Sequence, residues 1–164
     1  EKVFLDPYRP AITPRLEEAA SMCEQALKAG LKELDKFVHT HVLGPLCRAI
    51  NHRLGVEIGR IHYSSYLQAS SGSTDETEGP SFVQKSLNNL YEYIATEHLS
   101  RLPKKYSSMV AASIATFSIY TFVSHASLMR PLAETTRLHL TQDLADLELV
   151  LGQLLSKGGQ SKTL

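Results

Sequence analysis

The stretch that decides the fold is Tyr106–Leu155, which reads YSSMVAASIATFSIYTFVSHASLMRPLAETTRLHLTQDLADLELVLGQLL. Its first half, Met109–Met129, carries no formal charge when its histidine is neutral. Its second half spaces leucines at steps of four, three, four and three, which places them on one stripe of a helix: Leu140, Leu144, Leu147, Leu151 and Leu154. Pro131 separates the halves, because proline cannot continue a helix but fits its first turn. The pattern predicts a buried helix, a tight turn and an amphipathic helix folded back on it.

The bulk composition is that of a soluble globular protein. The 164 residues are 43% apolar and 21% charged, which is enough for one continuous core. Seventeen basic and seventeen acidic residues cancel, so the chain lacks the electrostatic footprint of a nucleic-acid binder or a polybasic membrane anchor. The first residue is Glu1, and we interpret the chain as a piece of a longer polypeptide.

Upstream, a helical pattern begins at Pro14, and acidic residues in its first turn suit the positive end of the helix dipole. Its apolar residues recur at steps of three and four: Leu16, Ala20, Cys23, Leu27, Leu31, Leu34, Val38, Val42, Leu46 and Ile50. Gly44-Pro45 is expected to kink or split this helix, which would otherwise be too long for a compact globule. We expect the helical pattern to continue to about Ser65.

The segment at about 68–80 is small, polar and acidic, and it is interpreted as a flexible loop. Ser81 and Gln84 then match a capping box, which predicts a helix start. The expected inner face of that helix is Val83, Leu87, Leu90, Tyr91, Ile94 and Leu99, and Leu102-Pro103 ends it. The residues at about 157–164 form an expected frayed tail. The fold predicted is all-α, an elongated bundle or helical rod of four to five long helices, in one domain over residues 1–164.

No constellation for chemistry emerges from the residues. No histidine follows a glutamate by three positions, and HExxH is missing, so neither a di-iron nor a zinc site is predicted. No GxSxG elbow or phosphate-binding glycine loop is present. Cys23 and Cys47 are interpreted as reduced core thiols. We therefore predict a protein that is not an enzyme and that has no cofactor or metal.

Three alternatives remain at this stage. The uncharged stretch Met109–Met129 is long enough to span a membrane, but its many serines and threonines favour a helix buried in a soluble bundle. Hydroxyls along residues 113–127 could instead line a pocket for a small molecule or lipid, in a binding protein or an enzyme. The last helix could lie on a membrane, although its polar face is acidic rather than basic.

Charged groups gather at the predicted hairpin turn: His125, Arg130, Glu134, Arg137 and Asp143. In one reading they form a clasp, in which Arg130 binds the last carbonyls of one helix and Glu134 favours the dipole of the next. In the other reading they form a polar patch that contacts another subunit. The residues alone leave both readings open.

The turn also carries a family resemblance. The sequence His-Ala-Ser-Leu-Met-Arg-Pro-Leu-Ala-Glu over residues 125–134, followed by Asp143-Leu144-Ala145 and Leu147-Glu148-Leu149, resembles the C-terminal region of subunit five of the conserved oligomeric Golgi complex. Upstream, residues 41–47 are similar to the segment that precedes a variable linker in that family. Ala133 and Thr135-Thr136 stand where the family pattern has glycines.

The resemblance implies a helical-rod tethering subunit on the cytosolic face of Golgi membranes. Such a subunit is non-catalytic, captures vesicles in intra-Golgi retrograde transport and works with sister subunits, SNAREs and Rab GTPases. It associates with the membrane through the complex and has no transmembrane segment. On this reading the turn motif is a structural or interaction element built from His125, Arg130, Pro131, Glu134, Asp143 and Glu148.

Overall fold

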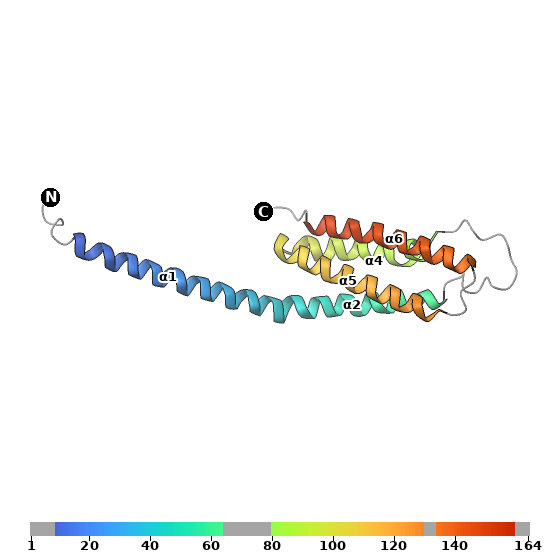
Figure 1. The fold of residues 1–164 in the computed structure, drawn as a ribbon, viewed down its shortest axis with the longest axis horizontal. Helices are drawn as coiled ribbons and strands as arrows, with labels where there is room; N and C mark the ends of the chain where they lie inside the picture. The colour runs from blue at the N-terminus through green and yellow to red at the C-terminus, as the bar shows by residue number, and fades with distance from the viewer. Residues whose placement is uncertain (1–8, 64–79, 130–133, 160–164) are drawn as a thin grey trace. The chain divides into compact units, whose positions relative to one another are not determined.

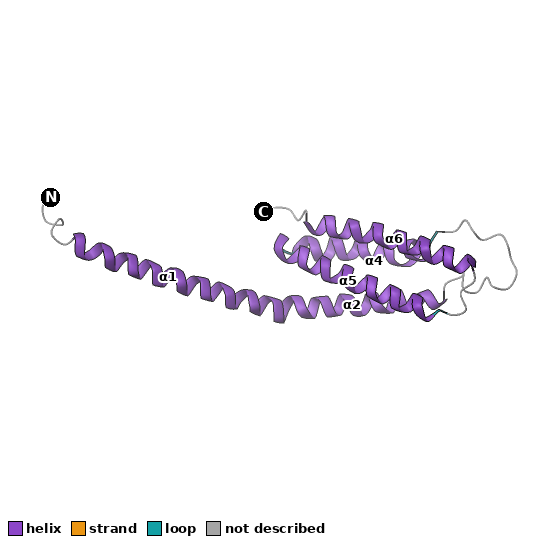
Figure 2. Cartoon of the chain, in the orientation of Figure 1, coloured by secondary structure: helices purple, strands orange, loops and turns teal. Residues whose placement is uncertain are grey.

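The computed structural model describes residues 9–63, 80–129 and 134–159, and all regular secondary structure in these ranges is helical (Figure 2). The predicted all-α class is therefore confirmed. The chain divides into two compact units, Glu1–Gly44 and Pro45–Leu164. The single-domain organisation stays a prediction.

The first unit consists mainly of helix α1, Arg9–Val38. It begins five residues before the predicted start, because Pro14 removes one backbone hydrogen bond without ending the helix. All side chains from residue 14 to residue 34 are exposed. The interpretation of Cys23 as a core thiol is therefore wrong, because its side chain is exposed on α1.

The helical backbone continues through a π-helical turn, His39–Leu43, into α2, Gly44–Gly59, and a 3-10 turn, Arg60–Tyr63. Gly44 itself has helical backbone angles, φ −59° and ψ −52°. The predicted split at Gly44-Pro45 is therefore wrong, because a proline in the first turn of a helix needs no amide donor; the alternative, a kink at this position, stays a prediction. The boundary between the two compact units does fall between these two residues.

The next helix starts where the capping box predicted it. The amide of Gln84 donates to Ser81 Oγ at 3.1 Å, and the amide of Lys85 donates to the Ser81 carbonyl at 3.0 Å. The helix passes through π-helical Val83–Leu87, α4 (Asn88–Tyr93), π-helical Ile94–His98 and 3-10 Leu99–Arg101. We refer to these four segments as the α4 helix. All six residues predicted for its inner face are buried.

Helices α5 (Lys104–Leu128) and α6 (Glu134–Gly159) form the predicted hairpin and run antiparallel against one another (Figure 1). Gly158 allows a close approach between them, because a Cβ there would lie 2.9 Å from Ala111 Cβ. Helix α6 extends to Gly159, so the first three residues of the segment predicted to fray are helical. The rest of that tail, and almost all of the predicted loop at 68–80, lie outside the described residues.

The core of the second unit is built from one face of each helix. It includes Ile50, Leu54 and Ile58 of α2, the α4-helix residues above, Val110, Ile114 and Phe122 of α5, and Leu147, Leu151 and Leu154 of α6. Leu144, which the spacing places in the buried leucine stripe of α6, is instead 45% exposed. The inner face of α6 takes in Asp143 and Asp146, two residues of the acidic polar face expected for this helix.

Candidate interaction surface

Two buried carboxylates of α6 hold the start of the α4 helix. Asp143, which is fully buried, accepts the Val83 amide at 3.3 Å, and Asp146 accepts the Gln84 side-chain amide at 3.1 Å. The first amides of a helix have no partner within it, so a carboxylate from another element can cap them and complement the helix dipole. Gln84 therefore turns away from the reciprocal bond of a capping box and binds α6 instead. These contacts are structural.

The phenol of Tyr91 is buried in the same bundle, with 2% of its surface exposed. Burial raises the pKa of Tyr91 to about 12, because the phenolate would lose its hydration, and Ser118 opposes part of this rise. The interaction with Ser118 does not meet the geometry of a hydrogen bond, since the Tyr91 hydroxyl has no hydrogen-bond partner among the described residues. The Ser118 hydroxyl donates to the Ile114 carbonyl at 2.8 Å.

His125 of the predicted turn cluster contacts a second histidine rather than the acidic residues of α6. Its Nδ1 lies 2.9 Å from Nε2 of His62, and the two rings meet edge to face at 5.0 Å. One ring donates and the other accepts, so the contact needs at least one neutral imidazole. A Cβ at Gly59 would lie 3.6 Å from the His125 ring, an ordinary contact, so the pair does not require a glycine there. This pair ties the end of α5 to the turn after α2.

The remaining motif residues do not gather at one place in the described structure. Glu134 opens α6 with 81% of its side chain exposed, 3.7 Å from Arg137 in a surface ion pair. Asp143 is buried under the α4 helix. Arg130 and Pro131 lie outside the described residues. His125 and Asp143 thus take part in different contacts, and the structure shows neither a joint clasp nor a joint patch among the described members.

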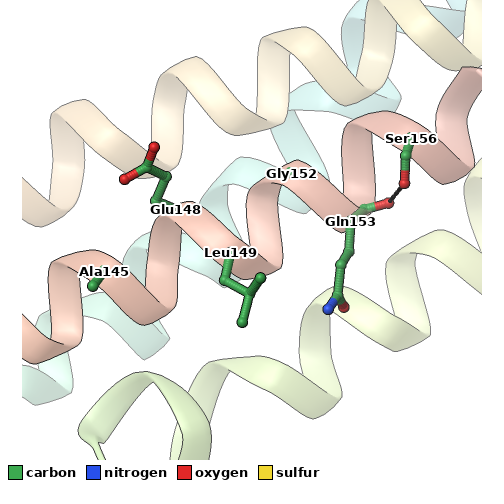
Figure 3. A pocket seen from close by; sticks show the side chains of 6 residues that line it. All are labelled: Ala145, Glu148, Leu149, Gly152, Gln153 and Ser156. Atoms are coloured by element: carbon green, nitrogen blue, oxygen red, sulfur yellow. Dashed lines mark hydrogen bonds between the residues drawn. The ribbon is translucent and has the colours of Figure 1, made fainter.

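Glu148 lines an open groove along the outer side of α6 (Figure 3). The groove has a volume of about 490 Å³ and is lined by Ala145, Glu148, Leu149, Gly152, Gln153 and Ser156. Leu149 is 62% exposed, and Figure 3 shows its side chain and that of Gln153 pointing to the side opposite Glu148. Small residues at positions 145 and 152 leave the backbone open to a neighbour. Such a surface offers packing and one carboxylate, which suits binding rather than catalysis.

The groove on α6 was not predicted, and it contains no residue of the Ser/Thr-rich stretch 113–127. Hydroxyls in that stretch bond back to their own helix: Ser118 to the Ile114 carbonyl, Ser124 to that of Tyr120, and Ser127 to that of Ser124. A serine hydroxyl that donates its hydrogen bond to a carbonyl of its own helix needs no ligand as a partner. Among the described residues, no group of three or more His, Cys, Asp and Glu side chains could hold a metal ion.

Helix α5 is long and apolar enough to cross a membrane by length and composition alone. One third of its most apolar window is buried in the bundle. Its buried face includes Ser107 and Ser118, and the opposite face exposes Ile119, Tyr120 and Val123. The core helix of a soluble protein passes the same test, so this finding is weak support for a span.

The described part of the chain defines a class of protein: an all-α bundle whose surface suits binding. Comparison with known proteins then points to a particular family. A subunit 5 of the conserved oligomeric Golgi complex from Arabidopsis thaliana is 31% identical to it over 124 residues, covering 68% of this chain and 14% of that protein. The mouse (Mus musculus) subunit 5 is 27% identical over 138 residues, covering 82% of this chain and 16% of that protein. The resemblance stated from the turn motif is thus confirmed.

The chain spans about one seventh of the length of these curated relatives. No protein-family model matches it, and no solved structure matches it.

Proposed function

We propose that this chain is part of subunit five of a Golgi vesicle-tethering complex, from its C-terminal region, and acts there as a non-catalytic helical scaffold. The observation that carries the proposal is the similarity to subunit 5 of the conserved oligomeric Golgi complex from a plant and a mammal. An all-α fold in which the two buried carboxylates of α6 hold the start of the α4 helix supports a binding role. The proposed partners are sister subunits of the complex, with SNAREs and Rab GTPases as further partners in retrograde transport.

Within this proposal the turn motif has two kinds of residue. Asp143 and His125 act inside the bundle, the first as a cap and the second in the histidine pair. Glu134 and Glu148 are exposed at different points of α6 and are available to another protein. We assign the interaction role of the motif to these two carboxylates. Rim charges of this kind affect association rate and specificity more than stability.

The test is an affinity purification of the chain from a Golgi-containing cell extract, with bound proteins measured by mass spectrometry. Recovery of named sister subunits of the complex is expected with the unmodified chain. The double variant Glu134→Lys and Glu148→Lys is expected to lower this recovery several-fold. Glu92→Lys, which reverses an exposed charge on the α4 helix, is the matched control and is expected to leave recovery unchanged. A folded chain that recovers no sister subunit would contradict the tether assignment. Equal recovery by all variants would contradict only the role of the two carboxylates.

We further propose that the chain lies on the cytosolic face of Golgi membranes and associates with them through the complex. A tagged chain in cells is expected to colocalise with Golgi markers. Alkaline carbonate is expected to release it from the membrane fraction, because it removes peripheral proteins and leaves membrane-spanning ones. Retention in the pellet would show that α5 spans the bilayer and would overturn the peripheral assignment.

A further inference from the structure

Helix α1 presents an apolar stripe that nothing in its own unit covers. Its members are Leu16, Ala20, Cys23, Leu27, Leu31 and Leu34, which are exposed, and Val38, which is half-buried. The four leucines are 58–67% exposed, although they lie on one side of a strongly amphipathic helix. Helices in proteins draw most of their stability from packing such a face rather than from intrinsic propensity. The stripe therefore calls for an occupant, and its own spacing indicates which one.

The spacing of the stripe is symmetric about Leu27. Its steps are four, three, four, four, three and four, so Leu16 and Val38 each stand eleven residues from the centre. An 11-residue repeat corresponds to about 3.67 residues per turn, close to the 3.6 of an α-helix, so the stripe drifts little around α1. Its length is about 33 Å at ~1.5 Å per residue. A stripe with this symmetry matches itself when a second helix is laid against it in the opposite direction.

We propose that a second copy of this chain binds α1 in an antiparallel orientation, with the two-fold axis at Leu27. Leu16 then faces Val38 of the other copy, and Leu27 faces its own equivalent. The layers between them set small against large: Ala20 faces Leu34, and Cys23 faces Leu31. Facing positions that alternate in size fill the space between two helices without voids. The interface is isologous, as two-fold dimers require. The inference does not rest on the tether assignment.

The residues beside the stripe also fit this arrangement. In a two-fold antiparallel pair, the same side of each helix faces its equivalent. One side carries Glu24 and Lys28, which form an ion pair at 2.5 Å within the chain. Across the axis, Glu24 lies about 3 Å in axial height from Lys28 of the second copy, so the pair can form between copies twice. The other side carries Ala19, Ala26 and Gly30, which bring no charge to desolvate.

One unfavourable contact occurs only in the antiparallel arrangement and so distinguishes it from a parallel one. The same geometry brings Glu17 alongside Asp35 of the second copy, two like charges about 3 Å apart in axial height. In a parallel pair, opposite sides would face, and Glu17 would meet Ala19 of the second copy instead. Reversing the charge at position 17 therefore strengthens an antiparallel dimer and leaves a parallel one unchanged.

Sedimentation equilibrium of the 164-residue chain tests whether the dimer forms. The expected result is a reversible monomer–dimer equilibrium whose upper mass is twice the 18.2 kDa of one chain. Leu27→Asp is expected to abolish it. Met22→Asp is the matched control, because Met22 is 65% exposed against 67% for Leu27 but lies about 140° away around the helix. A chain that stays monomeric up to about 100 μM, a range that includes weak association, would overturn the proposal, as would equal loss in both variants.

Disulfide cross-linking tests the orientation. In a chain with Cys23→Ser and Cys47→Ser, Leu27→Cys is expected to form an intermolecular disulfide with oxidised glutathione as the oxidant, because the two sulfurs meet at the axis. Leu16→Cys alone is expected not to cross-link, since its two copies lie about 33 Å apart. Leu16→Cys combined with Val38→Cys restores the cross-link. A covalent dimer of Leu16→Cys alone would overturn the antiparallel arrangement.

The charge reversal completes the test. Glu17→Lys is expected to lower the dimer dissociation constant several-fold, measured by the same sedimentation experiment at low salt, and the gain is expected to shrink as salt is raised. No change in the dissociation constant would contradict the register about Leu27.

Discussion

Truncation of Leu147 to alanine should destabilise the second unit far more than the same change at Leu144. The two leucines stand three residues apart in α6, so helix propensity and side-chain chemistry change equally in both variants. They differ in burial, because Leu147 is fully buried and Leu144 is 45% exposed. The comparison therefore isolates the contribution of the core contact.

The magnitude follows from the burial. Replacing a fully buried leucine by alanine costs about 2–5 kcal/mol, from lost transfer free energy and from the cavity left behind. A half-exposed leucine loses about 1 kcal/mol or less. With a urea dependence of about 1–3 kcal/mol per molar, a loss of 3 kcal/mol lowers the midpoint of unfolding by about 1–3 M. Domains of this size have only about 5–15 kcal/mol in total, so Leu147→Asp should leave the unit largely unfolded.

Urea denaturation followed by circular dichroism at 222 nm measures both variants against the unmodified chain. A midpoint lowered strongly by Leu147→Ala and only slightly by Leu144→Ala is the expected outcome. Equal shifts, or a larger shift at Leu144, would refute the orientation of α6 and with it the burial of Asp143 one turn earlier. The unit's two other buried α6 leucines, Leu151 and Leu154, should follow Leu147.

Three further predictions concern single contacts and use the same denaturation assay. Tyr91→Phe should stabilise the unit by about 1 kcal/mol, because it removes a buried hydroxyl without a hydrogen-bond partner. Tyrosine ionises at about pH 10 when unfolded and at about 12 here. Ionisation of Tyr91 therefore leaves the stability unchanged below pH 10 and removes roughly 2–3 kcal/mol between pH 10 and 12. A pH profile of Tyr91→Phe with the same slope would contradict the raised pKa. Asp143→Ala should lower the free energy of unfolding by about 1–3 kcal/mol, because the Val83 amide loses its buried acceptor. A loss below about 0.5 kcal/mol, the range of ordinary surface changes, would show that this cap does not stabilise the unit. Gly152→Ala should stabilise α6 by about 0.5–1 kcal/mol, since a Cβ there meets nothing within 4 Å, while Gly158→Ala should destabilise it through the contact with Ala111 at 2.9 Å; the same sign in both glycines would contradict the packing of α5 on α6.

Much of the fold could be predicted because its signals are local. The capping box at Ser81 and Gln84, the inner face of the α4 helix and the break at Leu102-Pro103 all depend on residues within a few positions of each other. Such signals act through one turn of backbone and need no distant partner. The candidate site was less accessible to this reasoning. The groove on α6 exists because no other helix covers Leu149 in the described structure. The spacing of residues along α6 does not show which positions the neighbouring helices leave uncovered.

The errors about Asp143, Asp146 and His125 share one physical cause. Asp143 and Asp146 belong to the polar face that spacing along α6 predicts, yet both are buried. Their partners are the Val83 amide and the Gln84 side chain, sixty and sixty-two residues away in the chain. His125 likewise binds a histidine sixty-three residues away instead of the charges next to it.

The sequence by itself determined the helical class, the helix that begins after Ser81, the hairpin of α5 and α6, and the resemblance to subunit five of the Golgi complex. Each of these depends on spacing along the chain, which is fixed before folding. Only the tertiary structure decided which side of α6 is buried and that the stripe of α1 is exposed. A period of three to four residues shows that a helix has an apolar side, but the neighbouring helices determine whether that side is covered.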